Sequence, residues 1–521
     1  MALNGKLRER IGALVRELRF EVFGPEGYPA WGTKFIDIEN QTAEVGDAIA
    51  CELLSQGLQE QAEAAGHHDG RCGGCGEPIP LEEIAGRLLQ AKRGEAVWQE
   101  SFGQCKRCRK AFFPQSKALG IRPDDTVSPA ALQKMVYAGA NATSFKQASA
   151  DLAEEAELTI SEQRIMRATK RIGEERIEQR ESEIEHWEQL SLPEQQCSPR
   201  EQVPAVAVVE MDGGRLQIRE RKPSAGDEKH SSHWREMKVG CLLSVASEVF
   251  AEDPCPPLPP LFLHRKRMRD MVREIKGFSV PEDEDSVHDE AAIQPRRGRP
   301  EVLVRSVVAT RQDVHFLGRQ LAAAAWQRGF SAAPRKAFVG DGQEANWTVH
   351  RTRFSHYVPI LDFIHVLCYI FTGALAGRRL RDGWPVYRQW AQWVWSGQVE
   401  QVIEALKIRQ QELGMPEDNE LEESPRQKVA DALRYLQNQK TRMRYDEYRR
   451  QGLPITSSHI ESTIKQINRR VKGTEKFWSG RGAEALLQLA ADYLSETKPL
   501  TTFWRERPSR ASGQRCYQAA T

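Results

Sequence analysis

The sequence predicts a multidomain α/β protein, and three observations support this prediction. At 521 residues the chain is too long for one ordinary hydrophobic core, since domains average roughly 150 residues. Two apolar runs that end in Asp-Gly, within 205–214 and 336–342, alternate with amphipathic helical segments, as strands and helices do in an α/β core. Two CxxC pairs near the amino end indicate a separate metal-binding segment.

Composition excludes several classes of protein. The sequence has no apolar run of about 18 residues, the length that a membrane helix requires, and its first residues, MALNGKLRERIGALVREL, are typical of a charged amphipathic helix rather than a signal peptide. Ten cysteines that include two CxxC pairs favour a metal site in a reducing compartment over a disulfide scaffold. We therefore expect a soluble, cytoplasmic protein without a membrane partner.

The front half is expected to be mostly helical around the cysteine segment. The predicted regions are helical residues 1–68, a zinc-binding segment 69–115 and helical residues 127–185. In the last region, helices at about 144–156 and 161–180 are separated by a short break. This arrangement resembles a DNA-binding helix-turn-helix, and a plain helical hairpin fits it equally well.

The cysteine segment predicts a structural zinc site. The pairs are separated by 29 residues, and four thiolates satisfy the tetrahedral coordination of Zn²⁺ without leaving a position for a substrate. A redox pair is the alternative, and His67 and His68 are nearby alternative ligands. The predicted zinc ligands are Cys72, Cys75, Cys105 and Cys108.

The second half changes from helical to strand-like periodicity after the loop at 192–204. Strands are expected at 205–214, 216–220, 234–250 and 336–342, and at the starts of 305–330 and 357–371. The corresponding regions are a core over 203–366 with a charged insertion at 251–300, a helical insertion at 367–452, carboxyl-terminal core helices at 453–495 and a tail at 496–521.

Three carboxylates occupy positions that favour chemistry. Asp212 and Asp341 each follow an apolar run and precede Gly, so either is an ordinary turn aspartate or projects into the crevice at the carboxyl ends of the strands. Glu461 begins a predicted helix, where Ser458-x-x-Glu461 also matches a capping box. Three acids that converge would repel one another unless cations neutralised them, and hard oxygen ligands select Mg²⁺ or Mn²⁺.

The same helix is basic beyond its first turn. From Lys440 to Arg481 the chain has eleven Lys or Arg and four acidic residues, a distribution that favours a polyanionic partner over an ordinary solvated face when it adjoins a candidate active site. The predicted phosphate-binding residues are Lys465, Arg469, Arg470 and Lys472.

These motifs together resemble the DDE transposases of bacterial insertion sequences, of the ISKra type and more distantly the Mutator-like enzymes. The resemblance lies in VVEMDGG at Asp212, FVGDG at Asp341 and LPITSSHIESTIKQINRRVKGTEKFW around Glu461, with Asp362-x-x-His365 similar to a further motif of Mutator-like enzymes. It implies an RNase H-like catalytic core interrupted by a helical domain, with Asp212, Asp341 and Glu461 as metal-binding catalytic triad. Asp362 and His365 would support this site, although His365 also fits an ordinary histidine at a helix start.

The resemblance implies a partner and an activity. The partners would be double-stranded DNA, as terminal inverted repeats and as target, and further copies of the chain in a dimer or larger assembly on the nucleoid. The activity would be cleavage at the element's ends and transfer of the 3′-hydroxyl to target DNA. The alternatives are an RNase H-like nuclease that only hydrolyses and a domesticated DNA-binding regulator.

Overall fold

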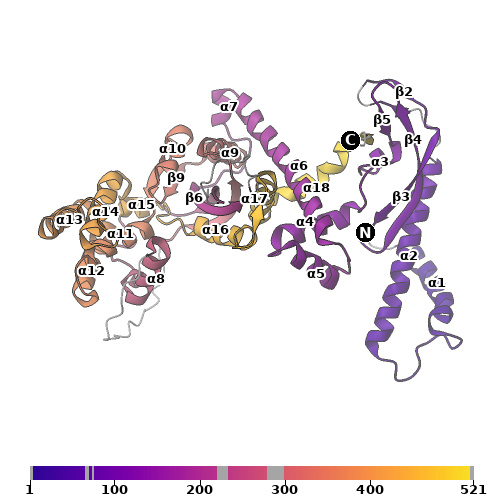
Figure 1. The fold of residues 1–521 in the computed structure, drawn as a ribbon, viewed down its shortest axis with the longest axis horizontal. Coiled ribbons are helices and arrows are strands. Elements are labelled where there is room, and N and C mark those ends of the chain that lie inside the picture. The colour runs from indigo at the N-terminus through magenta and orange to yellow at the C-terminus, as the bar shows by residue number, and fades with distance from the viewer. Residues whose placement is uncertain (1–3, 65–69, 73–74, 220–232, 278–297, 517–521) are drawn as a thin grey trace, which may run out of the picture. The chain divides into compact units, whose positions relative to one another are not determined.

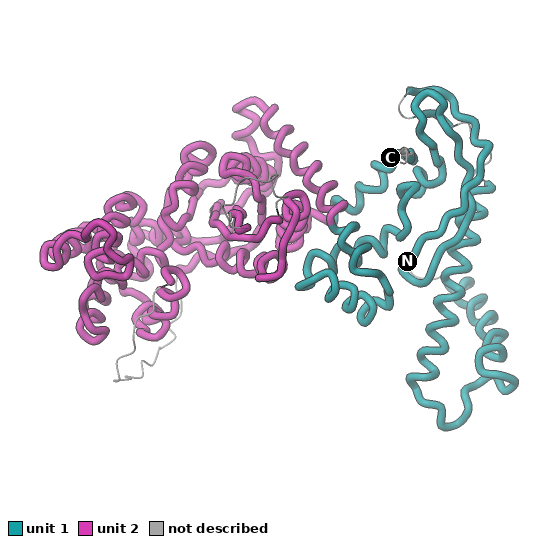
Figure 2. The backbone as a smooth tube through the Cα atoms, in the orientation of Figure 1, with its two compact units in different colours: residues 1–169, 501–521 teal, residues 170–500 magenta. Residues whose placement is uncertain are grey.

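The computed structural model describes residues 4–64, 70–72, 75–219, 233–277 and 298–516. Contacts divide the chain into two compact units (Figure 2). Unit 1 comprises residues 1–169 and 501–521, and unit 2 comprises residues 170–500. The fold is mixed α/β, as predicted. Residues 278–297 of the predicted charged insertion lie outside the described ranges, as do His67 and His68.

Unit 1 is built on a four-stranded antiparallel sheet of order β12-β5-β4-β3. Its strands and helices are β1 (Gly70–Arg71), β2 (Pro78–Ile79), β3 (Glu83–Gln90), β4 (Glu95–Cys105), β5 (Lys110–Phe112), β12 (Gln514–Cys516), α1 (Gly5–Phe23), α2 (Phe35–Ala64), α3 (Pro114–Ala118), α4 (Pro129–Asn141) and α5 (Phe145–Ala156). Strand β12 pairs with β5, and the backbone N–H of Phe113 donates to the Gly513 carbonyl at 2.8 Å. The sheet of unit 1 therefore includes residues from both ends of the chain (Figure 1).

The helices of the predicted helix pair are present in the structure. Helix α5 and helix α6 (Glu162–Gln189) are joined by residues 157–161, in which Leu158 and Ile160 are buried. Ser144 caps α5 by accepting a hydrogen bond from the Gln147 backbone. Helix α6 continues past residue 169 and becomes part of unit 2, so the boundary between the two units lies within a helix.

Unit 2 contains a mixed sheet surrounded by helices. The main order is β10-β9-β6-β7-β8, and the short β11 pairs with the end of β6. The strands are β6 (Val206–Ile218), β7 (Trp234–Ala246), β8 (Glu301–Thr310), β9 (Arg335–Gly340), β10 (Val358–Leu361) and β11 (Phe477–Trp478). Strands β6, β7 and β8 are antiparallel, whereas β6, β9 and β10 are parallel.

Helices cover both faces of this sheet. Those nearest to it are α9 (Val314–Gln327), α10 (Glu344–Arg353), α16 (Ser458–Val471) and α17 (Gly480–Leu494). On β7, a Cβ added to Gly240 would lie 2.6 Å from Leu321 of α9, whereas Cys241 Sγ is 3.4 Å from Thr463 Oγ1 of α16. Because successive strand residues point to opposite faces, α9 and α16 pack on opposite sides of β7.

A second helical group adjoins the sheet at β10. It contains α8 (Arg265–Lys276), α11 (Phe363–Leu375), α12 (Leu380–Trp395), α13 (Val399–Leu413), α14 (Pro425–Gln439) and α15 (Tyr445–Arg450). The short helices α7 (Leu192–Gln196) and α18 (Pro499–Glu506) are not part of this group. Helix α8 packs on α11, and Phe262, which precedes α8, meets the rings of Phe363 and Trp395. The described part of the charged insertion is therefore packed against the helical segment.

Two expectations about β6 are wrong. Residues 205–214 and 216–220 were predicted as separate strands with a turn at Asp212-Gly-Gly, but β6 is continuous from Val206 to Ile218. Its pairing with β7 extends without interruption from Val206 to Gln217. Both glycines are paired in register with β7, opposite Lys238 and Met237, and this strand pairing outweighs the local turn preference of Asp-Gly.

Candidate active site at the edge of the mixed sheet

The register of three parallel strands brings three aspartates to one level. The last paired residues are Glu210 with Val339 between β6 and β9, and Leu361 with Gly340 between β10 and β9. Asp212 lies two residues beyond Glu210, Asp341 follows Gly340 directly, and Asp362 follows Leu361 directly. Because these strands are parallel, the three aspartates lie at one level, just beyond the ends of β9 and β10. Asp341 follows its strand as expected, whereas Asp212 lies within β6, which continues to Ile218.

Helix α16 presents Glu461 to this edge from its first turn. The helix begins at Ser458, and Ser457 is the residue that precedes it. The predicted capping box is absent, since neither Ser458 nor Glu461 caps the described helix end through its side chain. The Ser457 hydroxyl instead donates to Asp362.

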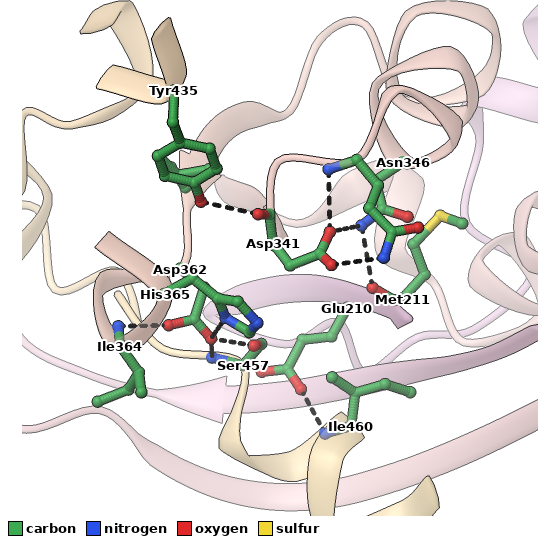
Figure 3. Close-up of polar contacts among 12 residues, drawn as sticks. Glu210, Met211, Asp341, Asn346, Asp362, Ile364, His365, Tyr435, Ser457 and Ile460 are labelled. Carbon is green, nitrogen blue, oxygen red and sulfur yellow. Dashed lines mark hydrogen bonds and ion pairs between the residues drawn. The ribbon is translucent and has the colours of Figure 1, made fainter. Parts of the chain in front are cut away.

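Asp362 fixes the start of two helices at the site (Figure 3). Its Oδ1 accepts a hydrogen bond from the Ile364 backbone at 2.6 Å, which caps α11, and its Oδ2 accepts one from the Ser457 backbone at 3.0 Å. His365 Nδ1 lies 3.6 Å from the same Oδ2. Asp362 is fully buried, so it orients α11, the start of α16 and the His365 ring.

Asp341 is positioned by side chains of α10 and α14. Its Oδ1 accepts hydrogen bonds from the Gln343 backbone at 3.0 Å and from Asn346 Nδ2 at 2.8 Å. Its backbone carbonyl accepts a hydrogen bond from the Tyr435 hydroxyl at 2.8 Å (Figure 3). The helical segment between Asp341 and Glu461 therefore contacts the loop that carries one of the predicted ligands.

The carboxylates influence one another electrostatically. Burial and then the charge of Asp341 raise the pKa of Asp212 to about 6. Burial and then the charge of Asp362 raise the pKa of Glu461 to about 7, with a smaller contribution from Asp212. Burial alone would lower the pKa of His365, but Asp362, Asp341 and Glu461 raise it to about 9. The site thus concentrates negative charge that a cation would stabilise.

Glu210 is a further acidic residue that the sequence analysis did not identify. It is fully buried on β6, two residues before Asp212, and its Oε2 accepts a hydrogen bond from the Ile460 backbone at 3.0 Å. Its Oε1 has no hydrogen-bond partner among the described residues. Burial raises the pKa of Glu210 to about 8, although the Ile460 N–H opposes this shift. The sequence signal that could have identified Glu210 is that it is an acidic residue within the otherwise apolar run 205–211.

The donor atoms at this edge fit a divalent cation. One ligand atom each from Asp362, His365 and Glu461 lie within 4.8 Å of one another, and His365 Nδ1 is buried without a hydrogen-bond partner within the described ranges. The predicted triad does not itself form so compact a group among these residues. Asp212 and Asp341 are nevertheless close enough to raise the pKa values of their neighbours, and hard carboxylate oxygens suit Mg²⁺ or Mn²⁺.

The basic residues of α16 divide into two sets. Lys465, Arg469 and Lys472 are exposed, and Lys465 Nζ lies 2.5 Å from Glu274 Oε1. Arg470 is buried at 4% exposure over the Trp478 ring, with 5.1 Å between guanidinium carbon and ring centroid. The prediction that Arg470 faces phosphates is therefore wrong, because this position faces the apolar side of the helix. Trp478 packs here and donates to the Val471 carbonyl at 2.8 Å.

In unit 1, the two CxxC pairs converge as predicted. The sulfur atoms of all four cysteines lie within 4.8 Å of one another, with 3.6 Å between those of Cys75 and Cys105. Tight turns shape both pairs, since the Gly76 N–H donates to the Cys72 carbonyl and the Arg109 N–H to the Cys105 carbonyl, each at 2.8 Å. The neighbouring thiols raise the pKa of Cys108 to about 12. Four sulfurs so arranged could bind a structural zinc ion.

No protein-family model matches this chain, and the curated proteins contain no match to it. Among the described helices, none combines the length and apolar character that crossing a membrane requires.

Proposed function

We propose that this chain is a DDE transposase of the bacterial insertion-sequence type, with an RNase H-like catalytic core in unit 2. The observation that supports this most is that Asp212 lies near enough to Asp341 and to Glu461 for their charges to interact, with the three acids carried by two parallel strands and a helix. The order of three antiparallel strands followed by two parallel ones also favours such a core. The helical segment α11–α15 would be the insertion domain between the second and third acids.

The residues of the site would have distinct tasks. Asp212, Asp341 and Glu461 would hold Mg²⁺ or Mn²⁺, with Asp362 and His365 as supporting groups. Such ions, when bound, activate a water or hydroxyl and stabilise the leaving oxygen during phosphodiester cleavage and joining. Asp362 would keep α16 in place, and Lys465, Arg469 and Lys472 would hold DNA phosphates beside the site.

Unit 1 would recognise DNA in this scheme. Lys106, Arg107, Arg109 and Lys110 surround the second cysteine pair, and the helix pair α5–α6 offers a second surface for element ends. We infer that the partners are the terminal repeats and target DNA, with more than one copy of the chain on the nucleoid. A nuclease that only hydrolyses needs no such recognition module, and a regulator that only binds DNA gains nothing from acids beside phosphates.

An in vitro joining assay tests the proposal. The substrates are a labelled duplex containing the DNA that flanks this coding sequence and a supercoiled target plasmid, with Mg²⁺. We expect the parent chain to join them and Asp341→Asn to lose joining by more than about hundredfold, the scale on which removing one charge-stabilising group acts. Asp382→Asn, an exposed aspartate on α12, is the matched control and should join normally.

The other outcomes are distinguishable. Cleavage of the duplex without joining would favour the nuclease. Binding of the duplex with neither reaction would favour the regulator. Equal joining by Asp341→Asn and the parent chain would show that the assignment of the triad is wrong.

A further inference from the structure

The amino-terminal hairpin of unit 1 leaves its apolar side chains exposed. Helix α1 and the amino-terminal half of α2 lie side by side beyond the end of the sheet (Figure 1), and neither helix has a buried residue in the described part of the chain. Only the carboxyl-terminal half of α2 packs on the sheet, where Gln59 Oε1 accepts from the Gln99 backbone at 2.8 Å. Two long helices with no buried residue are not stable on propensity alone, since helices in proteins depend on packing.

Four leucine and isoleucine residues of α1 follow a regular spacing, beside exposed Val15 and Phe20. Leu7, Ile11 and Leu14 are 43%, 41% and 43% exposed. With Leu18 they repeat at four, three and four residues, which is the seam of a helix that packs against another helix. The contact between α1 and α2 is slight, and it leaves Leu7, Ile11 and Leu14 exposed and Leu18 half-buried.

The exposed apolar residues of α2 add to this surface. Phe35 and Ile36 are 77% and 57% exposed at its start, and Leu53 is 67% exposed further along. Full burial of one aromatic side chain removes about 150–250 Å², so the apolar side chains of the two helices provide an area of the order of the about 800 Å² that each partner contributes to a stable interface.

The charges of the two helices are complementary. Helix α1 has five basic and three acidic residues, whereas α2 has seven acidic residues and no basic one. Within the hairpin as described, no ion pair joins the two helices; their polar contact is Gln41 Nε2 donating to the Val22 carbonyl at 2.7 Å. The basic helix therefore keeps its charge available for an acidic helix of another molecule.

We propose that the hairpin of residues 4–64, hereafter the amino-terminal hairpin, is the surface by which two copies of this chain associate. In a two-fold symmetric pair, α1 of each copy meets α2 of the other, so one self-complementary contact buries both apolar seams and sets basic against acidic helices. The product is an antiparallel four-helix arrangement, a common form for amphipathic helices with short connections. This inference goes beyond the proposed reaction and does not depend on it.

Charge reversal in two separate full-length variants tests the proposal. The first variant is Arg10→Glu/Arg16→Glu on α1, and the second is Asp37→Lys/Glu44→Lys on α2; all four positions are exposed. Each variant alone sets like charges against each other across the pair, whereas a mixture sets opposite charges against each other at both contacts. Molar mass is measured by light scattering or sedimentation at physiological salt.

We expect the parent chain to be a dimer and each variant alone to dissociate with a dimer constant at least about tenfold weaker. The equimolar mixture should recover the dimer mass, which a misfolded variant could not do. Leu192→Glu, at a position 73% exposed in unit 2, should remain a dimer, whereas Leu14→Glu should not.

Three results would overturn the proposal. The parent chain could be monomeric, or both variants could remain dimers, or the mixture could stay monomeric. A loss of DNA binding by Arg10→Glu/Arg16→Glu with unchanged molar mass would instead identify the hairpin as a nucleic-acid surface.

Discussion

Glu210 and Asp212 are two residues apart on β6, so their side chains point to the same face of the sheet, where α16 lies. The two acids differ in environment. Asp212 is only partly buried at the sheet edge, whereas Glu210 is fully buried and receives the Ile460 N–H at the start of the helix that bears Glu461. We infer that Glu210 positions this helix rather than holding a cation.

Replacement of Glu210 tests this positioning role. Glu210→Gln keeps an acceptor for the Ile460 N–H and nearly the same volume, so joining activity should persist. Glu210→Ala leaves a cavity and an unpaired buried N–H, and it should lower the free energy of unfolding by about 2–4 kcal/mol. Urea denaturation measures the difference, and equal stability of the two variants would contradict the role.

The pH dependence of stability provides a second test of the same residue. The pKa of Glu210 is raised in the folded chain from 4.5 to about 8, so its contribution to folding stability is fully present below about pH 4.5 and is lost as the pH rises through 8. The Glu210→Gln side chain cannot ionise, so this variant should be more stable than the parent chain at pH 9, in buffer with a chelator.

The control is Glu422→Gln at an exposed position, and its free energy of unfolding should depend on pH as that of the parent chain does. If Glu210→Gln shows this same pH dependence, the Glu210 carboxyl is ionised in the folded chain without cost.

At the scale of elements, the two cysteine turns link β1 and β2 to the end of β4 and the start of β5. Cys72 and Cys105 are buried with Ile79, Leu81 and Phe112 in a small cluster. So small a cluster provides little stabilisation by itself, and a bound metal commonly supplies the remainder in segments of this size.

Removal of one sulfur ligand should therefore affect unit 1 selectively. We expect the purified parent chain to contain one zinc ion per chain and Cys105→Ser to contain none, measured by elemental analysis. The variant should expose residues 70–112 to limited proteolysis while the fragment from unit 2 persists. Cys197→Ser, which changes an exposed cysteine, should keep its zinc, and a zinc content of zero in the parent chain would exclude a structural zinc site.

Much of the fold followed from local patterns. The apolar runs marked β6 and β9. The spacing of four, three and four residues between Ile460, Ile464, Ile467 and Val471 marked α16, because burial of one face leaves a periodic signal. The continuity of β6 could not be predicted in this way. It depends on pairing with β7, and the local turn preference at Gly213 and Gly214 contains no information about that pairing. Asp212, Asp341 and Glu461 stood out by their positions after apolar runs or at a helix start. Glu210 and the burial of Arg470 required knowledge of which residues face α16.

At the scale of the whole molecule, the chain builds unit 1, then unit 2, and then returns to unit 1. Within unit 2, α6 is joined to α17 by buried ion pairs, with 2.8 Å between Arg176 Nε and Asp492 Oδ2 and 3.0 Å between Arg180 Nη1 and Glu484 Oε1. Within unit 1, the returning segment contributes Phe503, which is buried, and strand β12.

Truncation after Leu500, the last residue of unit 2, should therefore damage the unit that is distant in sequence. We expect the shortened chain to lose unit 1 stability, because β5 loses its hydrogen-bonded neighbour and Phe503 leaves a cavity. Differential scanning calorimetry should show the transition of unit 1 lowered or absent and that of unit 2 nearly unchanged. An unchanged first transition would mean that β12 contributes little to the sheet.

The return of residues 501–516 to unit 1 has a consequence for biosynthesis. Domains generally fold as they leave the ribosome, in the order of the chain. Unit 1 departs from this order, because its first 169 residues emerge early while β12 is translated after all of unit 2. During that interval the free edge of β5 is a sheet edge open to other strands. A nascent chain that stalls within unit 2 would therefore carry an incomplete unit 1 and would be a target for chaperones and proteases.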